Sequence, residues 1–157
     1  MTVTIEVEDE SWRELLGLED LALRAAAAAL AGAGKALGEG EVALLFTSDS
    51  AVAELNAEWR GKAGATNVLS FPSAPDMPVP AGERRPLGDI VLAHGVIARE
   101  AREQGKTLHA HTSHLIVHGV LHLLGYDHED EQEALDMERL ETGILKGLGI
   151  PDPYERD

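Results

Sequence analysis

The stretch 115–128, Leu-Ile-Val-His-Gly-Val-Leu-His-Leu-Leu-Gly-Tyr-Asp-His, decides how this chain folds. From 115 to 124 it is apolar apart from two histidines, a composition typical of a helix that is buried nearly all round. Ten such residues are too few to span a membrane. Gly125 suits the left-handed residue that ends a helix, and Thr107 is placed to cap its beginning. We therefore predict a buried central helix over 108–124.

The histidines of this stretch are spaced for a metal ion. His118 and His122 are four residues apart and lie on one face of a helix, and a turn at Gly125 can bring His128 back as a third ligand. Three nitrogen ligands leave one position of a tetrahedral Zn²⁺ open, which is the catalytic rather than the structural pattern. The spacing predicts one Zn²⁺ per chain. The alternative is three core histidines bonded to backbone or water.

The same spacing occurs in the metalloprotease motif His-Glu-x-x-His-x-x-Gly-x-x-His, whose glutamate is the general base. This chain has Gly119 at that position, so peptide hydrolysis by the usual route is disfavoured. A glycine inside a helix costs about 1 kcal/mol relative to alanine. We therefore expect another part of the chain to approach the backbone closely at Gly119.

Other polar residues near the motif have weaker cases. His114 lies one turn before His118, which makes it a candidate hydrogen-bond partner of a metal ligand or a spare ligand. Asp127 is adjacent to the motif and could orient a ligand or serve only as a turn residue. His109 and His111 are expected to be solvated near the start of the helix, and His94 to begin another helix.

Composition bounds the class of protein. The chain has 157 residues, 44% of them hydrophobic, and no cysteine, which excludes a disulfide framework or a thiolate metal site. No stretch resembles a signal peptide or a transmembrane segment, so the expectation is a cytoplasmic protein without a membrane partner. The net charge of −15 taken alone argues against a nucleic-acid partner. However, basic residues gather in a few places and could line a groove: Arg60, Lys62, Arg84, Arg85, Arg99, Arg102 and Lys106.

Patterning along the chain predicts one α+β domain over 1–157, a small four-stranded mixed sheet covered by helices, with the metal motif on the buried central helix. The last helix is expected to present Leu135, Leu140, Ile144 and Leu148 as its apolar side, and Asp49 to cap the second long helix. The predicted strands are 2–7, 41–47, 68–71 and 87–93. The predicted helices are 18–33, 50–59, 94–103, 108–124 and 129–148.

These motifs resemble the YbeY family of bacterial rRNA maturation factors. The resemblance rests on the metal stretch 118–128, on Thr66-Asn-Val-Leu-Ser-Phe-Pro72 preceded by Arg60-Gly-Lys62, on 87–91, and on the tail with Glu141 and Tyr154. It covers roughly residues 41–154. Many relatives carry an aspartate where this chain has Ala63.

The resemblance implies a metal-dependent endoribonuclease specific for single-stranded RNA, a hydrolase of phosphodiester bonds. It implies a role in maturation of small-subunit rRNA, notably the 3′ end of 16S rRNA, and in ribosome quality control. Its partners would be rRNA, the small ribosomal subunit and assembly factors, with DNA not expected. Arg60 falls on the family's leading candidate for catalysis or RNA binding. Two alternatives stay open: a non-catalytic, zinc-stabilised ribosome assembly factor, and a metalloprotease-like hydrolase.

Overall fold

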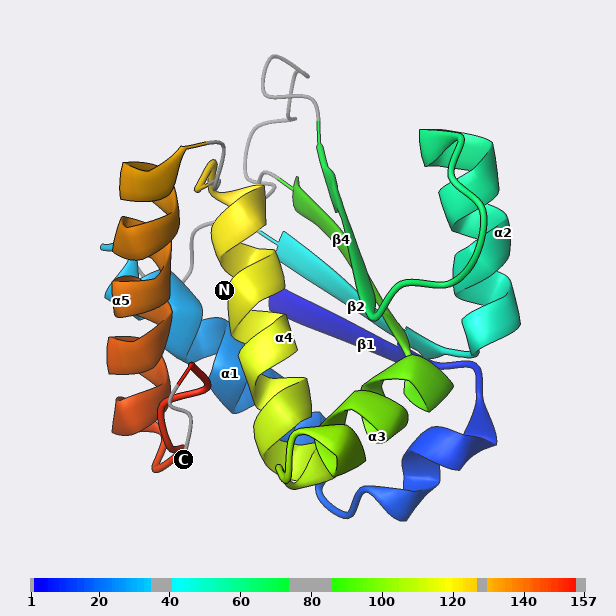
Figure 1. The fold of residues 1–157 in the computed structure, drawn as a ribbon, viewed down its shortest axis with the longest axis horizontal. Coiled ribbons are helices and arrows are strands. Elements are labelled where there is room, and N and C mark those ends of the chain that lie inside the picture. Colours follow the sequence, from blue (N-terminus) through cyan, green and yellow to red (C-terminus); the bar gives the residue numbers. More distant parts are fainter. Residues whose placement is uncertain (1, 35–40, 74–85, 127–129, 155–157) are drawn as a thin grey trace.

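The computed structural model describes residues 2–34, 41–73, 86–126 and 130–154. Strands and helices follow in the order that the sequence predicts, which confirms the α+β class (Figure 1). The strands are β1 (Thr2–Val7), β2 (Glu41–Thr47), β3 (Val68–Pro72) and β4 (Pro86–Ala93). The helices are η1 (Glu10–Glu14, a 3₁₀ turn), α1 (Leu18–Gly32), α2 (Asp49–Arg60), α3 (His94–Glu103), α4 (Leu108–Leu123) and α5 (Glu131–Gly147).

The four strands form one mixed sheet in the order β1-β2-β4-β3. β1 and β4 both run parallel to β2, whereas β3 pairs antiparallel with β4 and lies at an edge of the sheet. Alternate residues of β2 face the main core: Val42, Leu44 and Phe46 are buried, and the residues between them are only half-buried. The prediction of a four-stranded mixed sheet is confirmed.

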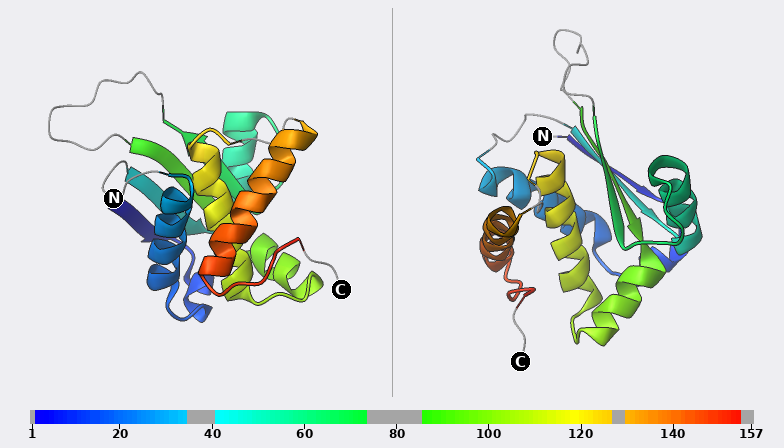
Figure 2. Two further views of the ribbon diagram at one scale, coloured as in Figure 1. Left: turned by 90° about the vertical axis from the view of Figure 1, so that its left-hand side faces the viewer. Right: turned by 45° about the horizontal axis from the view of Figure 1, so that its top comes forward.

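Helices cover the two faces of the sheet unequally. α1 and α4 pack side by side against one face with α5 outside them, and α2 lies on the other face (Figures 1 and 2). The main core is therefore between the sheet and α1 and α4, and a smaller cluster of Val52, Leu69, Val91 and Ala93 lies under α2. Within the described residues, no helix combines the length and apolarity needed to cross a membrane.

α4 is the buried central helix that the sequence predicts. The Thr107 side chain accepts a hydrogen bond from the Ala110 N–H (3.0 Å) and so caps its first turn. Ile116, Val117, Val120 and Leu121 have no exposed surface. At the other end Gly125 has a φ of 100°, a left-handed conformation that a side chain would strain, so the predicted helix-ending role of this glycine is confirmed.

Two local predictions are wrong. The side chain that caps α2 is that of Ser48, which accepts from the Ala51 N–H (3.2 Å). The Asp49 carboxylate instead accepts from the Val96 N–H (3.0 Å) near the start of α3. On α5 the prediction fails only at Leu135, which is 45% exposed; Ile144 is buried, and Leu140 and Leu148 pack against the main core. The buried residues of that helix are Met137, Glu141, Ile144 and Leu145.

Candidate metal centre and RNA cleft

The central feature of the candidate site is the row of histidines on α4. His118 Nε2 and His122 Nε2 lie 3.1 Å apart, as the spacing of four residues predicts. Two imidazole nitrogens bound to one tetrahedral zinc ion at 2.0–2.1 Å would be about 3.3 Å apart. The observed distance suits this arrangement as well as a hydrogen bond between the two rings. The distance between the two Nε2 atoms therefore fits the shared metal ion that the sequence predicts.

The other ring nitrogen of His118 is held by a buried carboxylate from α5. Glu141 has no exposed surface, and its Oε1 forms a hydrogen bond with His118 Nδ1. Its Oε2 receives two more contacts, from His114 Nε2 at 3.1 Å and from the Tyr154 hydroxyl. The carboxylate thus ties two histidines of α4 to the C-terminal segment.

These contacts keep Glu141 ionised. Burial raises the pKa of its carboxyl group, but hydrogen bonds from His114, His118 and Tyr154 outweigh burial and lower the pKa to about 2. Because an ionised carboxylate can only accept hydrogen bonds, the proton of the shared bond belongs to His118 Nδ1. A neutral imidazole with its proton on Nδ1 has its lone pair on Nε2, the atom that faces His122, and this is the form in which imidazole binds a metal.

A second group of possible ligands overlaps the first. His114, His118 and Glu141 each offer an atom within 4.8 Å of the others. An ion between them would have to displace hydrogen bonds that Glu141 already makes in a fully buried position. His118 and His122, in contrast, both line an open cleft. The donor chemistry therefore fits a metal between His118 and His122, with Glu141 as the partner of a ligand.

Arg60, the residue that the resemblance links to catalysis or RNA binding, lies in the same cleft as His118 and His122. The cleft has a volume of about 490 Å³ and runs between α4 and the edge strand β3. Arg60, the last residue of α2, lines it together with His118 and His122. Gly61 ends α2 with a φ of 65°, a left-handed turn in which glycine is favoured. The structure therefore unites a permanently charged guanidinium and two imidazoles in one cleft. Its lining consists of Arg60, Asn67, Val68, Leu69, Ser70, Pro72, His118, His122, Gly125 and Tyr126.

A polar network fixes the wall of this cleft at the beginning of β3. Asn67 donates from Nδ2 to Glu100 Oε1 (3.0 Å), and its Oδ1 accepts from the Val68 N–H (2.7 Å). His111 Nε2 lies 2.9 Å from the same Glu100 oxygen. Earlier in the same loop, the Gly64 carbonyl accepts a hydrogen bond from Asn56 Nδ2 of α2 (2.9 Å). These contacts anchor the segment that follows Arg60.

The close approach expected at Gly119 is present. A Cβ atom there would lie 3.0 Å from Ile90 Cδ1 and 3.3 Å from Ser70 Oγ, so the sheet packs directly on the α4 backbone. A glutamate, the general base of the metalloprotease motif, could be placed at this position only by displacing the side chains of Ile90 and Ser70. The geometry opposes the metalloprotease interpretation.

The remaining histidines differ in their surroundings. His109 is exposed, as predicted, and His94 begins α3 with its Nε2 3.1 Å from Glu14. The prediction that His111 is solvated is wrong: it is 4% exposed. Its pKa is lowered by burial, against the opposing influence of the Glu100 hydrogen bond. His128 and Asp127 lie outside the described residues, so their roles stay predictions.

Several residues of the site belong to the stretches that carry the family resemblance, but the sequence-based prediction gives them no role of their own. Glu141, Tyr154, Asn67, Ser70 and Tyr126 all contact the histidines or line the cleft. For Glu141 the sequence does contain a signal, since it shares a helical face with Met137, Ile144 and Leu145. A carboxylate on the apolar face of an amphipathic helix indicates a buried partner.

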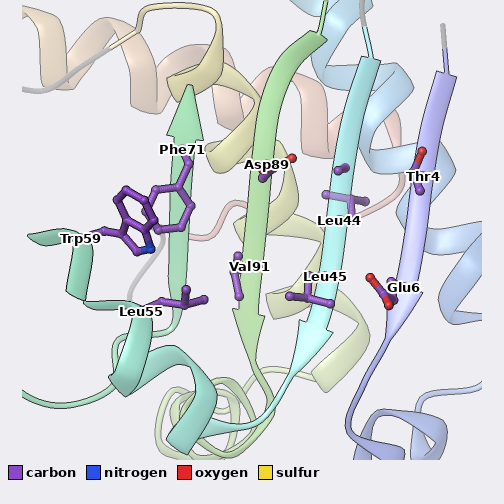
Figure 3. A pocket seen from close by; sticks show the side chains of 10 residues that line it. Thr4, Glu6, Leu44, Leu45, Leu55, Trp59, Phe71, Asp89 and Val91 are labelled. Atoms are coloured by element: carbon purple, nitrogen blue, oxygen red, sulfur yellow. The ribbon is translucent and has the colours of Figure 1, made fainter. Parts of the chain in front are cut away.

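A second hollow lies on the opposite face of the sheet, under α2, and has a volume of about 520 Å³ (Figure 3). Leu45, Val91 and Leu55 form much of its apolar lining, and Trp59 and Phe71 stand at the edge formed by β3 (Figure 3). It contains neither the described histidines of α4 nor Arg60. This hollow is therefore separate from the described metal-binding candidates on α4 and α5.

Known proteins resemble this chain over nearly its whole length. Proteins named Endoribonuclease YbeY from Azorhizobium caulinodans and Paramagnetospirillum magneticum are 46% and 49% identical to it. Each alignment covers 98% of this chain, and 96% and 98% of the respective relative. A third, from Rhodopseudomonas palustris, is 46% identical over 96% of this chain and 79% of the relative.

The fold also has a counterpart among solved structures. The solution structure of TM1509 from Thermotoga maritima superposes with a TM-score of 0.59 over 99% of this chain and all of that one, at 22% identity. The family model described as Endoribonuclease YbeY matches residues 5–149. The chain belongs to the YbeY endoribonuclease family.

Proposed function

We propose that this protein is a zinc-dependent endoribonuclease that cuts single-stranded RNA. In this proposal residues 1–157 form one metal-dependent hydrolase domain that holds one Zn²⁺ per chain. Its biological role would be the maturation of small-subunit rRNA, notably the 3′ end of 16S rRNA, and ribosome quality control. The small ribosomal subunit and assembly factors would be its partners, in the cytoplasm.

One observation carries the proposal. His118 and His122, with their Nε2 atoms 3.1 Å apart, line the same cleft as Arg60. A paired-imidazole metal site and a guanidinium are together suited to a phosphodiester, which is negatively charged and is cleaved through a more highly charged transition state.

The proposed ligands are His118, His122 and His128. A zinc ion held by these residues would supply a Lewis acid for the phosphate and activate the water that attacks it. Arg60 would contact the phosphate through its forked N–H groups. Glu141 would keep His118 in the Nδ1–H tautomer, and Asp127 would orient the neighbouring His128.

The direct test is cleavage of a labelled single-stranded RNA at low salt, compared with the same sequence in a duplex. We expect the single strand to be cut, chelation to abolish the cleavage, and zinc to restore it. Cleavage that persists in chelator, or that is equal on duplex RNA, would contradict the proposal. Co-sedimentation with ribosomes and zinc binding without any cleavage would favour a non-catalytic assembly factor instead.

A further inference from the structure

The described chain ends in a segment that folds back against the helices of the site. Residues 150–154, here called the C-terminal strap, follow α5 and run back toward α3 and α4 (Figure 2). Lys106 Nζ donates to the Pro153 carbonyl (2.8 Å), and the Tyr154 N–H donates to Asp152 Oδ1 (2.8 Å). The Tyr154 ring packs edge-on against His114, with centroids 5.5 Å apart. The strap is thus held in place by contacts at several residues.

Within the described residues, hydrogen bonds connect the strap to His118 through Glu141, and the Tyr154 hydroxyl also lies 3.3 Å from His114 Nε2. The Tyr154 hydroxyl donates to Glu141 Oε2, the oxygen that also lies 3.1 Å from His114 Nε2. The opposite oxygen, Oε1, is bonded to His118 Nδ1. Tyr154 does not line the cleft that contains His118 and His122.

We propose that Tyr154 and Glu141 are positioning residues: the strap holds the Glu141 carboxylate, the carboxylate holds His118 in its Nδ1–H tautomer, and docking of the strap thereby sets the metal affinity of a site that it does not touch. The proposal rests on the proposed metal site of His118 and His122. It adds a control of that site by the C-terminal segment.

The orientation of the Glu141 carboxylate depends on its hydrogen bonds rather than on its charge alone. Glu141 has no exposed surface, so no bulk water can replace a lost donor. Burial together with the Glu141 contact raises the pKa of Tyr154, so its hydroxyl stays protonated and remains a donor at every working pH. Without that donor, the carboxylate keeps one fewer of the contacts that fix its orientation toward His118.

Zinc affinity tests the proposal without any RNA. Zn²⁺ would be titrated against a chromophoric chelator with wild-type protein, Glu141→Gln, Tyr154→Phe and Glu138→Gln. Glu138 lies one turn before Glu141 on α5, and its charge also acts on Tyr154, so Glu138→Gln removes a nearby charge without touching the hydrogen bonds of Glu141. Circular dichroism would confirm that each variant is folded.

We expect Glu141→Gln to weaken zinc binding by about 10- to 100-fold. Tyr154→Phe should weaken it by about three- to tenfold, since one hydrogen bond is lost. Glu138→Gln should stay within about twofold of wild type. If Glu141→Gln does not fold, Tyr154→Phe alone decides the question, because it keeps the ring and removes only the hydroxyl.

A second readout reports the tautomer directly. Nitrogen-15 NMR of metal-free wild-type protein should show His118 protonated at Nδ1, and Glu141→Gln should show a mixture of tautomers. Wild-type zinc affinity and tautomer in both Glu141→Gln and Tyr154→Phe would overturn the proposal and leave the proposed function intact. Zinc binding that is abolished in Glu141→Gln but retained in His122→Ala would also overturn it, because Glu141 would then be a ligand. A wild-type chain that binds no zinc would overturn the proposed metal site as well.

Discussion

At the scale of single residues, His118 connects the buried carboxylate of Glu141 with the second histidine of the site, His122. One of its ring nitrogens is bonded to the buried Glu141, and the other lies 3.1 Å from His122 Nε2. In the proposed function the two nitrogens have separate roles: one fixes the orientation of the ring, and the other binds the metal ion.

This division predicts different consequences for the neighbouring histidines. His122→Ala should lower zinc affinity by more than about 100-fold, because a ligand is lost, whereas His114→Ala should still bind one zinc ion with weaker affinity. Isothermal titration with zinc would measure both, with the exposed His109→Ala as the control. Loss of zinc in His114→Ala together with full binding in His122→Ala would place the ion at the group of His114, His118 and Glu141 instead.

Arg60 should matter for the reaction but not for the metal. Arg60→Ala is expected to bind zinc like wild type and to cleave RNA on the order of 10² times more slowly, because a fixed donor to the phosphate is lost. Arg60→Lys should recover only part of the rate, since lysine lacks the fork of N–H groups. Arg24→Ala is the matched control, since Arg24 is an exposed residue of α1 with Asp20 as its ion-pair partner. Cleavage by Arg60→Ala at the wild-type rate would show that the role assigned to Arg60 is wrong.

What the sequence could predict at this scale depended on local spacing. His118 and His122 are one helical turn apart, so helix geometry alone predicts that their rings share a face. The contacts of Glu141 with His118 and with Tyr154 join residues 23 and 13 positions apart. They depend on how α5 and the strap pack against α4, which no local pattern determines. His111 shows the converse: its place near a helix start predicts exposure, but α3 covers it with Glu100.

At the scale of elements, the site depends on how closely α4 packs against the sheet. Gly119 lets Ile90 of β4 and Ser70 of β3 approach the helix backbone, which places the histidine face of α4 beside the edge strand. Predicting a close approach at this glycine was possible because glycine is unfavourable inside a helix without a packing reason. Predicting which strands approach it was not, because strand order depends on pairings between distant segments.

Two glycine substitutions separate packing from helix propensity. Gly119→Ala should destabilise the protein by about 1–3 kcal/mol, because its Cβ would lie 3.0 Å from Ile90 Cδ1. Gly143→Ala on α5 meets nothing within 4 Å and should stabilise by about 0.5–1 kcal/mol through propensity alone. Urea unfolding midpoints would measure both. A stabilising Gly119→Ala would contradict the packing described for α4.

The start of α2 shows why the boundaries of a helix are harder to predict from the sequence than its existence. Ser48 and Asp49 are adjacent and both are good capping residues, so the sequence does not distinguish them. The structure uses Ser48 for α2 and lets Asp49 bond the Val96 N–H of α3. Val96 lies 47 residues after Asp49 in the chain. Their hydrogen bond depends on tertiary packing, so no local sequence pattern predicts it.

At the scale of the whole molecule, the α+β class and the mixed sheet followed from the alternation of strand and helix patterns along the chain. The strand order β1-β2-β4-β3 could not be predicted from the sequence, because it arises from pairings between distant segments, such as that of β1 with β2, about 40 residues apart. The net charge of −15 was a poor guide to partners. The cleft depends on where Arg60 lies rather than on the sum of charges.

Stability should depend on pH through the buried His111. Because burial lowers its pKa in the folded protein, the unfolded chain binds a proton at this residue more readily than the folded one. The free energy of unfolding should therefore fall as the pH drops through about 6.5, the ordinary pKa of histidine, toward the lowered folded value. Urea unfolding of metal-free protein at pH 7.5, 6.5 and 5.5 would measure this. His111→Gln should show a smaller fall than wild type; an equal or larger fall would refute the assignment.

If one metal ion on α4 makes this chain a ribonuclease, as we propose, activity must follow zinc occupancy. Zinc would be added stepwise to chelated protein at low salt while cleavage of single-stranded RNA is followed, in wild type and in His122→Ala. We expect wild-type activity to rise from none to a plateau at about one zinc per chain, and His122→Ala to stay inactive throughout. Zinc-independent cleavage, or equal activity in His122→Ala, would contradict the proposal.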